Sequence, residues 1–528
     1  MADEIGTVGV VGLGTMGAGI VEVFARSGLP VTALEIDDAA LARGRDTLRA
    51  STDRAVRKGK LTAEQAAGIL DRITFTTDYA AMAGADLVVE AAPERMAIKH
   101  AVFTELDRVC GPHAILATNT SSLSVTEIAH HTTRPHRVVG MHFFNPAPVM
   151  KLVEVIGTVV ADQDAVDTVV ALCRRLGKTP VEVGDRPGFV ANYLLLGYLN
   201  QAAWLVSDGY VSAADLDDAM RLGAGLPMGP LTLMDLIGID TIVEILDVIH
   251  TYGGASRRHA CAPLLRQLAA AGRYGRKSGH GFYRYAKAGS GAPAAPAAGS
   301  ASAGTEPAPA QPATVAVLDD PAAAAALSAA GVPARELSDV DKSALAGVDL
   351  VVVGAGADAA TYAALGAATD AVLAVDSATD QITAAGAASG RPGAVVGLHL
   401  VGEFAEIART VGTDDAAVAA ARGLAEALGR RSVVVDERAG LVVEALLVPY
   451  LNDAIGMLAS GYADADGIDH AMTLGCGYPE GPIAAIDRLG PAAVLAAARA
   501  LYAESGEPSR APSPLLAQLV AAGRGARG

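Results

Sequence analysis

The sequence predicts an α/β protein in which a doubly wound sheet is followed by an all-helical domain, and this pair of domains occurs a second time in degenerate form. Three observations lead to this prediction. The chain has 528 residues, too many for one ordinary core. Apolar residues make up 51% of it and aromatic residues only 4%, a composition typical of helix-rich α/β proteins. Apolar runs alternate with helical segments over the first third of the chain.

Strands of the first sheet are expected at the apolar runs 5–11, 31–35, 86–91, 114–118 and 137–142. From Gly188 the pattern changes to long apolar stretches with helical spacing, such as 189–207 and 231–250, which predicts the all-helical domain. Residues 286–313 are nearly all Ala, Pro, Gly and Ser, the composition of a flexible linker.

An internal repeat follows the linker. Residues that recur at one offset of 252 are Gly209-Tyr210, Met220, Gly223, Gly225, Pro227, Gly229-Pro230, Asp235 and Gly238, which return as Gly461-Tyr462, Met472, Gly475, Gly477, Pro479, Gly481-Pro482, Asp487 and Gly490. The expected domains are therefore a nucleotide-binding sheet domain (1–185), a helical domain (186–285), the linker (286–313), a degenerate sheet domain (314–437) and a second helical domain (438–528).

The formal net charge of −17 argues against a nucleic acid or an anionic membrane as partner. One short basic cluster, Arg54, Arg57, Lys58 and Lys60, is compatible with a solvated helix face. Four cysteines without paired spacing argue against a disulfide framework and a zinc site, and fit the cytoplasm. We expect no metal, no signal peptide and no membrane span.

A glycine fingerprint at Gly12, Gly14 and Gly17 lies between the first strand and a helix. This Rossmann-type arrangement lets the backbone approach a pyrophosphate and directs helix N-terminal amides at it. Glu35 ends the second strand, where its carboxylate would accept hydrogen bonds from a ribose diol and repel a 2′-phosphate. The sequence therefore predicts NAD rather than NADP.

His142 is a candidate general base, with Glu154 twelve residues further on. A histidine accepts a proton from an alcohol near neutral pH, and a carboxylate behind it fixes its tautomer. A single histidine at a strand end is more often structural. From these residues alone, both interpretations stay open.

A set of motifs over residues 5–285 resembles the L-3-hydroxyacyl-CoA dehydrogenases. The motifs are Gly12 to Gly17, Glu90-Ala91-Ala92-Pro93-Glu94, Thr118-Asn119-Thr120-Ser121-Ser122, His142 to Pro146, Glu154, Arg186-Pro187-Gly188-Phe189 with Asn192, and Gly275 to Gly279 with Gly281-Phe282-Tyr283. The resemblance implies NAD-dependent oxidation of a 3-hydroxyacyl-CoA, such as 3-hydroxybutyryl-CoA, to the 3-ketoacyl-CoA, and the reverse, in fatty-acid or related acyl-CoA metabolism.

The resemblance also implies roles for individual residues. His142 would be the base, Glu154 would orient it, and Ser121 and Asn192 would polarise the substrate. Positions near the nicotinamide half of the cofactor are Glu94, Lys99, Asn145 and Lys277, and positions that meet coenzyme A are Ser51 and Lys58, with Ser121 at the substrate.

The second copy is expected to be catalytically inactive. Asp319-Asp320-Pro321 stands in place of the glycine turn, and carboxylates there would repel a pyrophosphate. His399 is kept, but by sequence Glu154 is matched by Arg409 and Asn192 by Glu444. In the family the helical domain mediates dimerisation, which implies an intrachain pseudo-dimer of the two helical domains and leaves a further homo-oligomer open.

Other functions compatible with the sequence are a 3-hydroxyadipyl-CoA dehydrogenase, a dehydrogenase of a free hydroxy acid that is similar to gulonate or carnitine dehydrogenases, and a nucleotide-binding pseudoenzyme. Ser51 and Lys58 favour a CoA thioester over a free acid. The intact first-half motifs argue against a pseudoenzyme.

Overall fold

The computed structural model describes residues 5–286, 288–289, 293–296 and 306–528. The chain divides into two compact units. The first unit consists of residues 1–195, 248–255 and 457–484, and the second of residues 196–247, 256–456 and 485–528. The first unit thus combines the first sheet with a helical segment from the second copy.

The first unit contains an eight-stranded sheet with the order β3-β2-β1-β4-β5-β6-β7-β8. Its first six positions have the strand order of dinucleotide-binding folds. The strands are β1 (Val8–Val11), β2 (Val31–Leu34), β3 (Ile73–Thr76), β4 (Leu87–Glu90), β5 (Ile115–Thr118), β6 (Val138–Phe143), β7 (Leu152–Gly157) and β8 (Thr179–Gly184). Neighbouring strands pair in parallel except β6 and β7, which are antiparallel. The sheet is therefore mixed rather than wholly parallel, because a short connection turns the chain back after β6.

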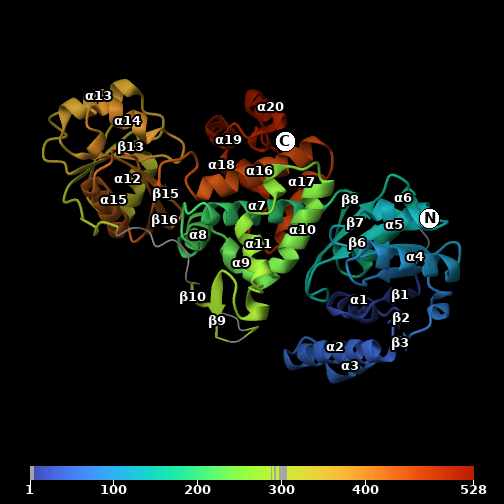
Figure 1. The fold of residues 1–528 in the computed structure, drawn as a ribbon. Coiled ribbons are helices and arrows are strands. Elements are labelled where there is room, and N and C mark those ends of the chain that lie inside the picture. Colours follow the sequence, from blue (N-terminus) through green and yellow to red (C-terminus); the bar gives the residue numbers. More distant parts are fainter. Residues whose placement is uncertain (1–4, 287, 290–292, 297–305) are drawn as a thin grey trace. The chain divides into compact units, whose positions relative to one another are not determined.

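Helices lie around the first sheet, as Figure 1 shows. They are α1 (Thr15–Arg26), α2 (Asp38–Arg57), α3 (Ala63–Leu70), η1 (Tyr79–Met82), α4 (Met96–Val109), α5 (Val125–His130), η2 (Pro135–Arg137) and α6 (Gln163–Arg175). Alternate residues of the central strands form one core with α1 and α6. Every residue of β1, β4 and β5 is buried, because helices cover both faces of such strands.

The helical region of the first copy begins in the first unit and continues in the second. Its elements are α7 (Ala191–Ser207), α8 (Ala213–Asp218), the π-helical η3 (Ala219–Gly223), α9 (Pro230–Ile237), α10 (Ile239–Tyr252), η4 (Arg257–His259), α11 (Pro263–Ala270), η5 (Arg276–Ser278) and the short strands β9 (Tyr283–Tyr285) and β10 (Pro293–Pro296). Gly238, with φ +109°, separates α9 from α10, so the expected stretch 231–250 is two helices.

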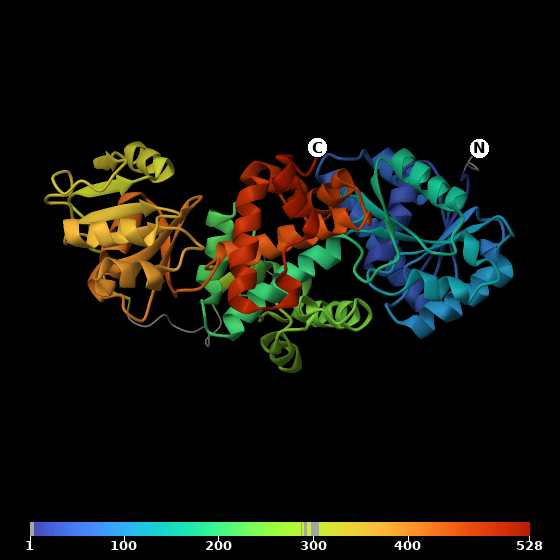
Figure 2. The same ribbon diagram turned by 90° about the horizontal axis from the view of Figure 1, so that it is seen from above.

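The second unit contains a seven-stranded sheet with the order β12-β11-β13-β14-β15-β16-β17. This sheet domain is coloured yellow to orange in Figure 2. The strands are β11 (Val315–Leu318), β12 (Ala334–Leu337), β13 (Leu350–Gly354), β14 (Val372–Asp376), β15 (Val395–Val401), β16 (Phe404–Arg409) and β17 (Arg431–Asp436). The helices between them are α12 (Pro321–Ala329), α13 (Ala359–Ala368), α14 (Ile382–Ser389), η6 (Pro392–Ala394) and α15 (Asp415–Ala427). The β15 and β16 pair is antiparallel, as β6 and β7 are.

The second helical region consists of α16 (Val443–Ala459), α17 (Ala465–His470), the π-helical η7 (Ala471–Gly475), α18 (Pro482–Leu489), α19 (Pro491–Ser505), η8 (Pro508–Arg510) and α20 (Pro514–Ala522). Its order of elements repeats that from α7 to α11. The predicted fold class, a doubly wound sheet and a helical region that both recur, is confirmed. No helix among the described residues is long and apolar enough to span a membrane.

The repeated glycines of the helical regions have a packing role. A side chain at Gly229 would overlap Asp217, whose carboxylate accepts hydrogen bonds from the amides of Leu231 and Thr232 at the start of α9. In the second copy, Gly481 has the same relation to Asp469. Glycine is therefore needed where a capping carboxylate packs against the chain.

Part of the predicted linker makes contacts with the neighbouring domains. Residues 287, 290–292 and 297–305 lie outside the described residues, whereas β10 pairs with β9. Residues 306–313 lie against α15, where Glu306 pairs with Arg422 and the amide of Ala310 donates to the carbonyl of Ala419. This stretch therefore makes contacts with the second sheet domain that its composition does not reveal.

Candidate active site

The glycine turn at the end of β1 leaves room for a phosphate group. Gly12 has φ +89°, and a side chain there would lie 2.8 Å from the carbonyl oxygen of Ala91. A side chain at Gly17 would overlap the carbonyl of Gly12, whereas the space beside Gly14 is open to 4 Å. Gly12 and Gly17 thus allow the tight turn, and Gly14 leaves the N-terminus of α1 accessible, as a bound pyrophosphate requires.

Glu35 is close to this turn. Its Oε1 accepts a hydrogen bond of 2.6 Å from the amide of Leu13, and its Oε2 accepts one of 2.9 Å from the amide of Ile36. The carboxylate is therefore fixed at the end of β2, next to the fingerprint. This is the position in which an acidic residue meets the adenosine ribose in dinucleotide-binding folds.

Lys99, on α4, is buried between two carboxylates, one at the end of β4 and one in the connection between β4 and α4. Its Nζ lies 2.9 Å from Glu90 Oε1 and 3.2 Å from Glu94 Oε2, and the lysine is 1% exposed. Burial opposes the ionisation of Glu94, but Lys99 and hydrogen bonds from Thr120 and Ser121 outweigh it, so the pKa of Glu94 lies below its ordinary value. Lys99 therefore holds Glu94 rather than facing an open surface.

Ser121 and Asn192 come together at this point. The amide of Ser121 donates to Glu94 Oε1 at 2.8 Å and its hydroxyl lies 3.2 Å from the same oxygen. The side-chain amide of Asn192, at the start of α7, lies 3.5 Å from the carbonyl oxygen of Ser121. Both residues lie in the first unit, so the structure brings together the two predicted substrate-polarising residues.

His142 and Glu154 form the centre of the site. They are direct neighbours across β6 and β7, and His142 Nδ1 lies 2.8 Å from Glu154 Oε2. The other oxygen of Glu154 accepts hydrogen bonds of 3.0 Å from the amides of Val190 and Ala191. Glu154 is fully buried and His142 is 6% exposed. The pair is thus fixed on both sides.

This arrangement defines the tautomer of His142. Glu154 accepts the Nδ1 proton of the neutral ring, which leaves the lone pair of Nε2 free to accept a proton. Nε2 makes no hydrogen bond within the described part of the chain. Two aromatic rings flank the imidazole, Phe144 at 4.6 Å and Phe189 at 5.7 Å between centroids. The site can therefore act as a general base in a largely apolar pocket.

Sequence reasoning assigned no role to Asn119, Phe144 or Phe189. Asn119 Oδ1 accepts a hydrogen bond of 2.8 Å from the amide of Phe143 and so fixes the end of β6. Phe189 has φ +47°, which is unusual for a residue with a side chain. All three belong to motifs that the sequence does reveal, but their contacts depend on the folded backbone.

The contacts described above do not include the remaining predicted residues. Asn145 follows β6 and is exposed. Ser51 is half-buried on α2, and Lys58 is exposed at its C-terminal end. None of the side chains of the basic cluster, Arg54, Arg57, Lys58 and Lys60, forms an ion pair with a described residue. Lys277 belongs to the second unit, where its Nζ lies 2.6 Å from Asp240.

The second copy has an equivalent histidine–carboxylate arrangement. The expected match of Glu154 with Arg409 is wrong, because Glu406 takes this position. Glu406 lies opposite His399 across β15 and β16, and its Oε1 accepts hydrogen bonds from the amides of Val442 and Val443. These are the contacts that Glu154 makes in the first copy. The connection between the two strands is shorter in the second copy, which displaces a match made by sequence.

The electrostatics of the two histidines nevertheless differ. His399 lies 3.7 Å from Asp376 and 4.0 Å from Glu406, and Glu444 replaces Asn192 nearby. Burial lowers the pKa of His399, but the three carboxylates outweigh it and raise the pKa to about 9. His399 is therefore protonated at neutral pH and cannot accept a proton there. Asp319-Asp320 also replaces the glycine turn, and Asp320 caps α12.

Comparison with known proteins gives three findings. The model of the 3-hydroxyacyl-CoA dehydrogenase NAD binding domain matches residues 7–186, and that of the C-terminal domain matches residues 188–285 and again 440–527. A 3-hydroxyadipyl-CoA dehydrogenase of Escherichia coli is 34% identical over 519 residues, 98% of each chain. A probable 3-hydroxybutyryl-CoA dehydrogenase of Bacillus subtilis is 46% identical over 283 residues, 53% of this chain and 98% of the relative.

A solved structure resembles the whole chain. The crystal structure of a 3-hydroxybutyryl-CoA dehydrogenase from Escherichia coli aligns with 99% of this chain and 100% of its own, with a TM-score of 0.80 and 31% identity. Relatives thus match either the first half alone or the full tandem arrangement.

Proposed function

Because the chain belongs to the 3-hydroxyacyl-CoA dehydrogenase family, we propose that its first half oxidises L-3-hydroxyacyl-CoA to 3-ketoacyl-CoA and catalyses the reverse reaction with NAD. The observation that carries the proposal is the buried His142–Glu154 pair with its free Nε2. An initial-rate panel with acetoacetyl-CoA, longer 3-ketoacyl-CoAs and free 3-keto acids, followed as NADH consumption, tests it. Turnover of free acids alone would contradict it.

The residues of the site divide the work. NAD supplies the hydride acceptor when it is bound. His142 Nε2 takes the proton of the substrate hydroxyl, and Glu154 stabilises the imidazolium that results. Ser121 and Asn192 hold the hydroxyl and the thioester carbonyl, so that catalysis depends on positioning and proton transfer.

The residues that would hold NAD fit that cofactor. The open space at Gly14 and the fixed carboxylate of Glu35 suit a pyrophosphate and an unphosphorylated ribose. Glu94, kept ionised by Lys99, would lie near the nicotinamide together with Asn145. Among the described residues, no group of His, Cys, Asp and Glu could hold a metal ion.

The substrate is a CoA thioester in this proposal, with Ser51 and Lys58 at the coenzyme A moiety, since unpaired basic side chains suit its phosphates. A cavity of about 380 Å³ in the first unit is lined by Ser122, Leu123, Val248 and Tyr252, and by the carboxylates of Glu127 and Asp185, but by no basic residue. A short, uncharged acyl end such as that of 3-hydroxybutyryl-CoA fits this lining.

The second candidate substrate is 3-hydroxyadipyl-CoA. It is favoured by the Escherichia coli relative of that name, which matches the chain over its full length. Its terminal carboxylate would meet like charges at Glu127 and Asp185 if it entered this cavity. Adding 3-hydroxyadipyl-CoA to the rate panel distinguishes the two, because the higher kcat/KM identifies the preferred acyl end.

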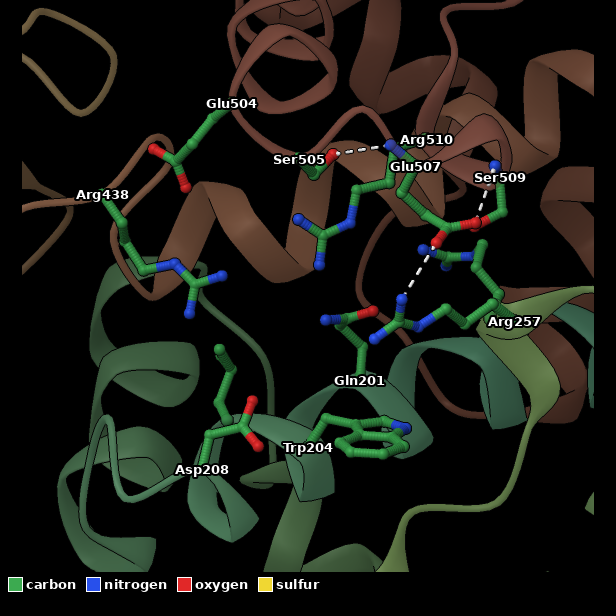
Figure 3. Close-up of a pocket in the computed structure, with 12 residues that line it drawn as sticks. Gln201, Trp204, Asp208, Arg257, Arg438, Glu504, Ser505, Glu507, Ser509 and Arg510 are labelled. Atoms are coloured by element: carbon green, nitrogen blue, oxygen red, sulfur yellow. Dashed lines mark hydrogen bonds and ion pairs between the residues drawn. The ribbon is translucent and has the colours of Figure 1, made fainter.

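We propose that the second copy acts as a built-in partner, forming an intrachain pseudo-dimer. Within the second unit, α7 contacts α16: the rings of Tyr198 and Tyr450 are 6.2 Å apart, and Arg258 lies 2.5 Å from Asp453. Figure 3 shows the polar pocket at this contact, lined by Gln201, Trp204 and Asp208 of the first copy and by Arg438, Glu504 and Arg510 of the second. Such contacts would replace those that single-copy enzymes make between subunits.

The domain limits given above, 1–185, 186–285, 286–313, 314–437 and 438–528, remain part of this proposal. So does a cytoplasmic location, which the four unpaired cysteines support because a reducing compartment keeps thiols free.

A further inference from the structure

A segment of the second copy, Tyr462–Cys476, packs against the first sheet within the first unit. The hydroxyl of Tyr462 donates a hydrogen bond of 2.8 Å to the carbonyl oxygen of Gly184, the last residue of β8. The guanidinium of Arg186 lies over the Tyr462 ring at 4.4 Å. Burial raises the pKa of Tyr462, so its hydroxyl stays protonated and remains a donor.

The backbone that Tyr462 binds leads directly to Glu154. After Gly184 the chain turns through Phe189, with φ +47°, and then presents the amides of Val190 and Ala191 to Glu154 Oε1. This turn therefore sets the position of the carboxylate that orients His142. Tyr462 fixes the start of the turn, six residues before Val190.

A second contact of the same segment reaches the other side of the histidine. A side chain at Gly475, at the end of η7, would lie 2.5 Å from Leu152 and 3.3 Å from the ring of Phe144. The Phe144 ring is 4.6 Å from His142. Leu152 begins β7, the strand that carries Glu154. The segment thus contacts the end of β8 on one side of the catalytic pair, and Leu152 and Phe144 on the other.

Equivalent contacts occur at the corresponding site of the second copy, with the roles of the two copies exchanged. Tyr210 of the first copy donates a hydrogen bond of 2.9 Å to the carbonyl oxygen of Asp436, the last residue of β17, and Arg438 lies over its ring at 4.7 Å. Gly223 packs against Val401 and Val443 of the second unit. Two equivalent tyrosines therefore exist, of which only Tyr462 acts on an intact site.

We propose that Tyr462 is a positioning residue for the His142–Glu154 pair, through which the second copy holds the active site of the first. This inference rests on the proposed function of that site. It explains why the tyrosine and the glycine of this segment persist in a copy that has lost its own glycine turn.

The test compares Y462F with Y210F, the equivalent substitution in the first copy, in the full-length protein. Each variant loses one hydroxyl and its hydrogen bond to the carbonyl at the end of a strand. With acetoacetyl-CoA and NADH, Y462F should lower kcat by about three- to tenfold, the usual effect of one hydrogen bond, and leave the KM for NADH unchanged. Y210F should keep kcat within about twofold. Equal kcat values for the two variants overturn the proposal.

A double-mutant cycle separates positioning from general loosening of the fold. On an E154Q background, where the carboxylate is already removed, Y462F should lower the residual kcat by less than about twofold, because it acts through Glu154. The same factor in both backgrounds overturns the proposal. If Y462F lowers the Tm much more than Y210F does, the pair G475A and G223A replaces it, and only G475A should reduce kcat.

A spectroscopic readout distinguishes this proposal from the proposed function. With histidine-selective labelling, the Nδ1 proton that His142 donates to Glu154 gives a downfield NMR signal. Y462F should shift or broaden it, and Y210F should not. An unchanged signal in Y462F contradicts the positioning role even if the substrate is another hydroxy compound, whereas a wild-type protein without acetoacetyl-CoA turnover contradicts the proposed function alone.

Discussion

Glu406 lies opposite His399 across β15 and β16 at the register that places Glu154 opposite His142 across β6 and β7. The second copy has thus kept both members of the catalytic pair. It differs in the residues around them, because Asp376 and Glu444 add two carboxylates beside the imidazole. We therefore expect His399 to fail as a base because of the excess negative charge beside it, and not because a carboxylate is missing.

The first prediction is that the second copy contributes no turnover. His399→Asn should leave kcat with acetoacetyl-CoA within about twofold of wild type, since the residue lies outside the reacting site. Calorimetric titration of the intact chain should give one NADH site. Two sites per chain, or a large loss of rate in this variant, would show that the second sheet binds cofactor and reacts.

The second prediction concerns pH and stability. The pKa of folded His399 is about 9, above the ordinary 6.5, so its stabilising effect is fully present below pH 6.5 and is lost as the pH rises through 9. The difference corresponds to about 3 kcal/mol at most. Thermal unfolding from pH 6 to pH 10 should show His399→Asn less stable than wild type at pH 6, with the gap closing by pH 10. A difference in stability that does not change with pH would contradict the interaction of His399 with the three carboxylates.

The third prediction tests the base of the first copy. His142→Gln should lower kcat by about 100-fold or more, because Nε2 no longer accepts the proton. Binding of NADH should persist, since the glycine turn at Gly12 to Gly17 is separate from the histidine. Fluorescence titration with NADH controls for folding. A variant that keeps about a tenth of wild-type turnover would exclude His142 as the base.

The fourth prediction concerns the choice of cofactor. Glu35 is fixed beside the turn by the amide of Leu13, and its charge repels a 2′-phosphate. NADH should therefore exceed NADPH in kcat/KM by a wide margin. Glu35→Gln should narrow that margin by removing the repulsion while retaining an acceptor for Leu13. Equal kcat/KM values for NADH and NADPH in the wild type would show that the ribose does not bind beside Glu35.

The sequence predicts best what is contiguous in the chain. The turn from Gly12 to Gly17 lies within one short motif, so its geometry follows from local rules. The match of Glu406 was missed because a shortened hairpin shifts the alignment, and only strand register reveals it. The contact of Tyr462 with Gly184 joins two positions far apart in the chain, which no local pattern encodes.

The last prediction concerns the dependence of the first copy on the second. A shortened chain of residues 1–286 lacks residues 457–484, which belong to the same compact unit as the first sheet. Leu152 and Val181, buried beneath Gly475 and Gly467, would then be exposed. We expect this chain either to self-associate through its own helical region or to unfold at a lower temperature, because exposed apolar surface favours both outcomes.

Light scattering, thermal unfolding and acetoacetyl-CoA reduction measure these outcomes in the shortened chain. Co-expression with residues 306–528 as a separate chain is the matched control, and it should restore the Tm and the rate by replacing the missing contacts. In a self-associated form, segment 210–224 of another copy could take the place of the missing Tyr462–Cys476. The activity of the shortened chain should therefore rise with protein concentration. A shortened chain that is a fully stable and active monomer at every concentration would refute the role of the second copy as a built-in partner.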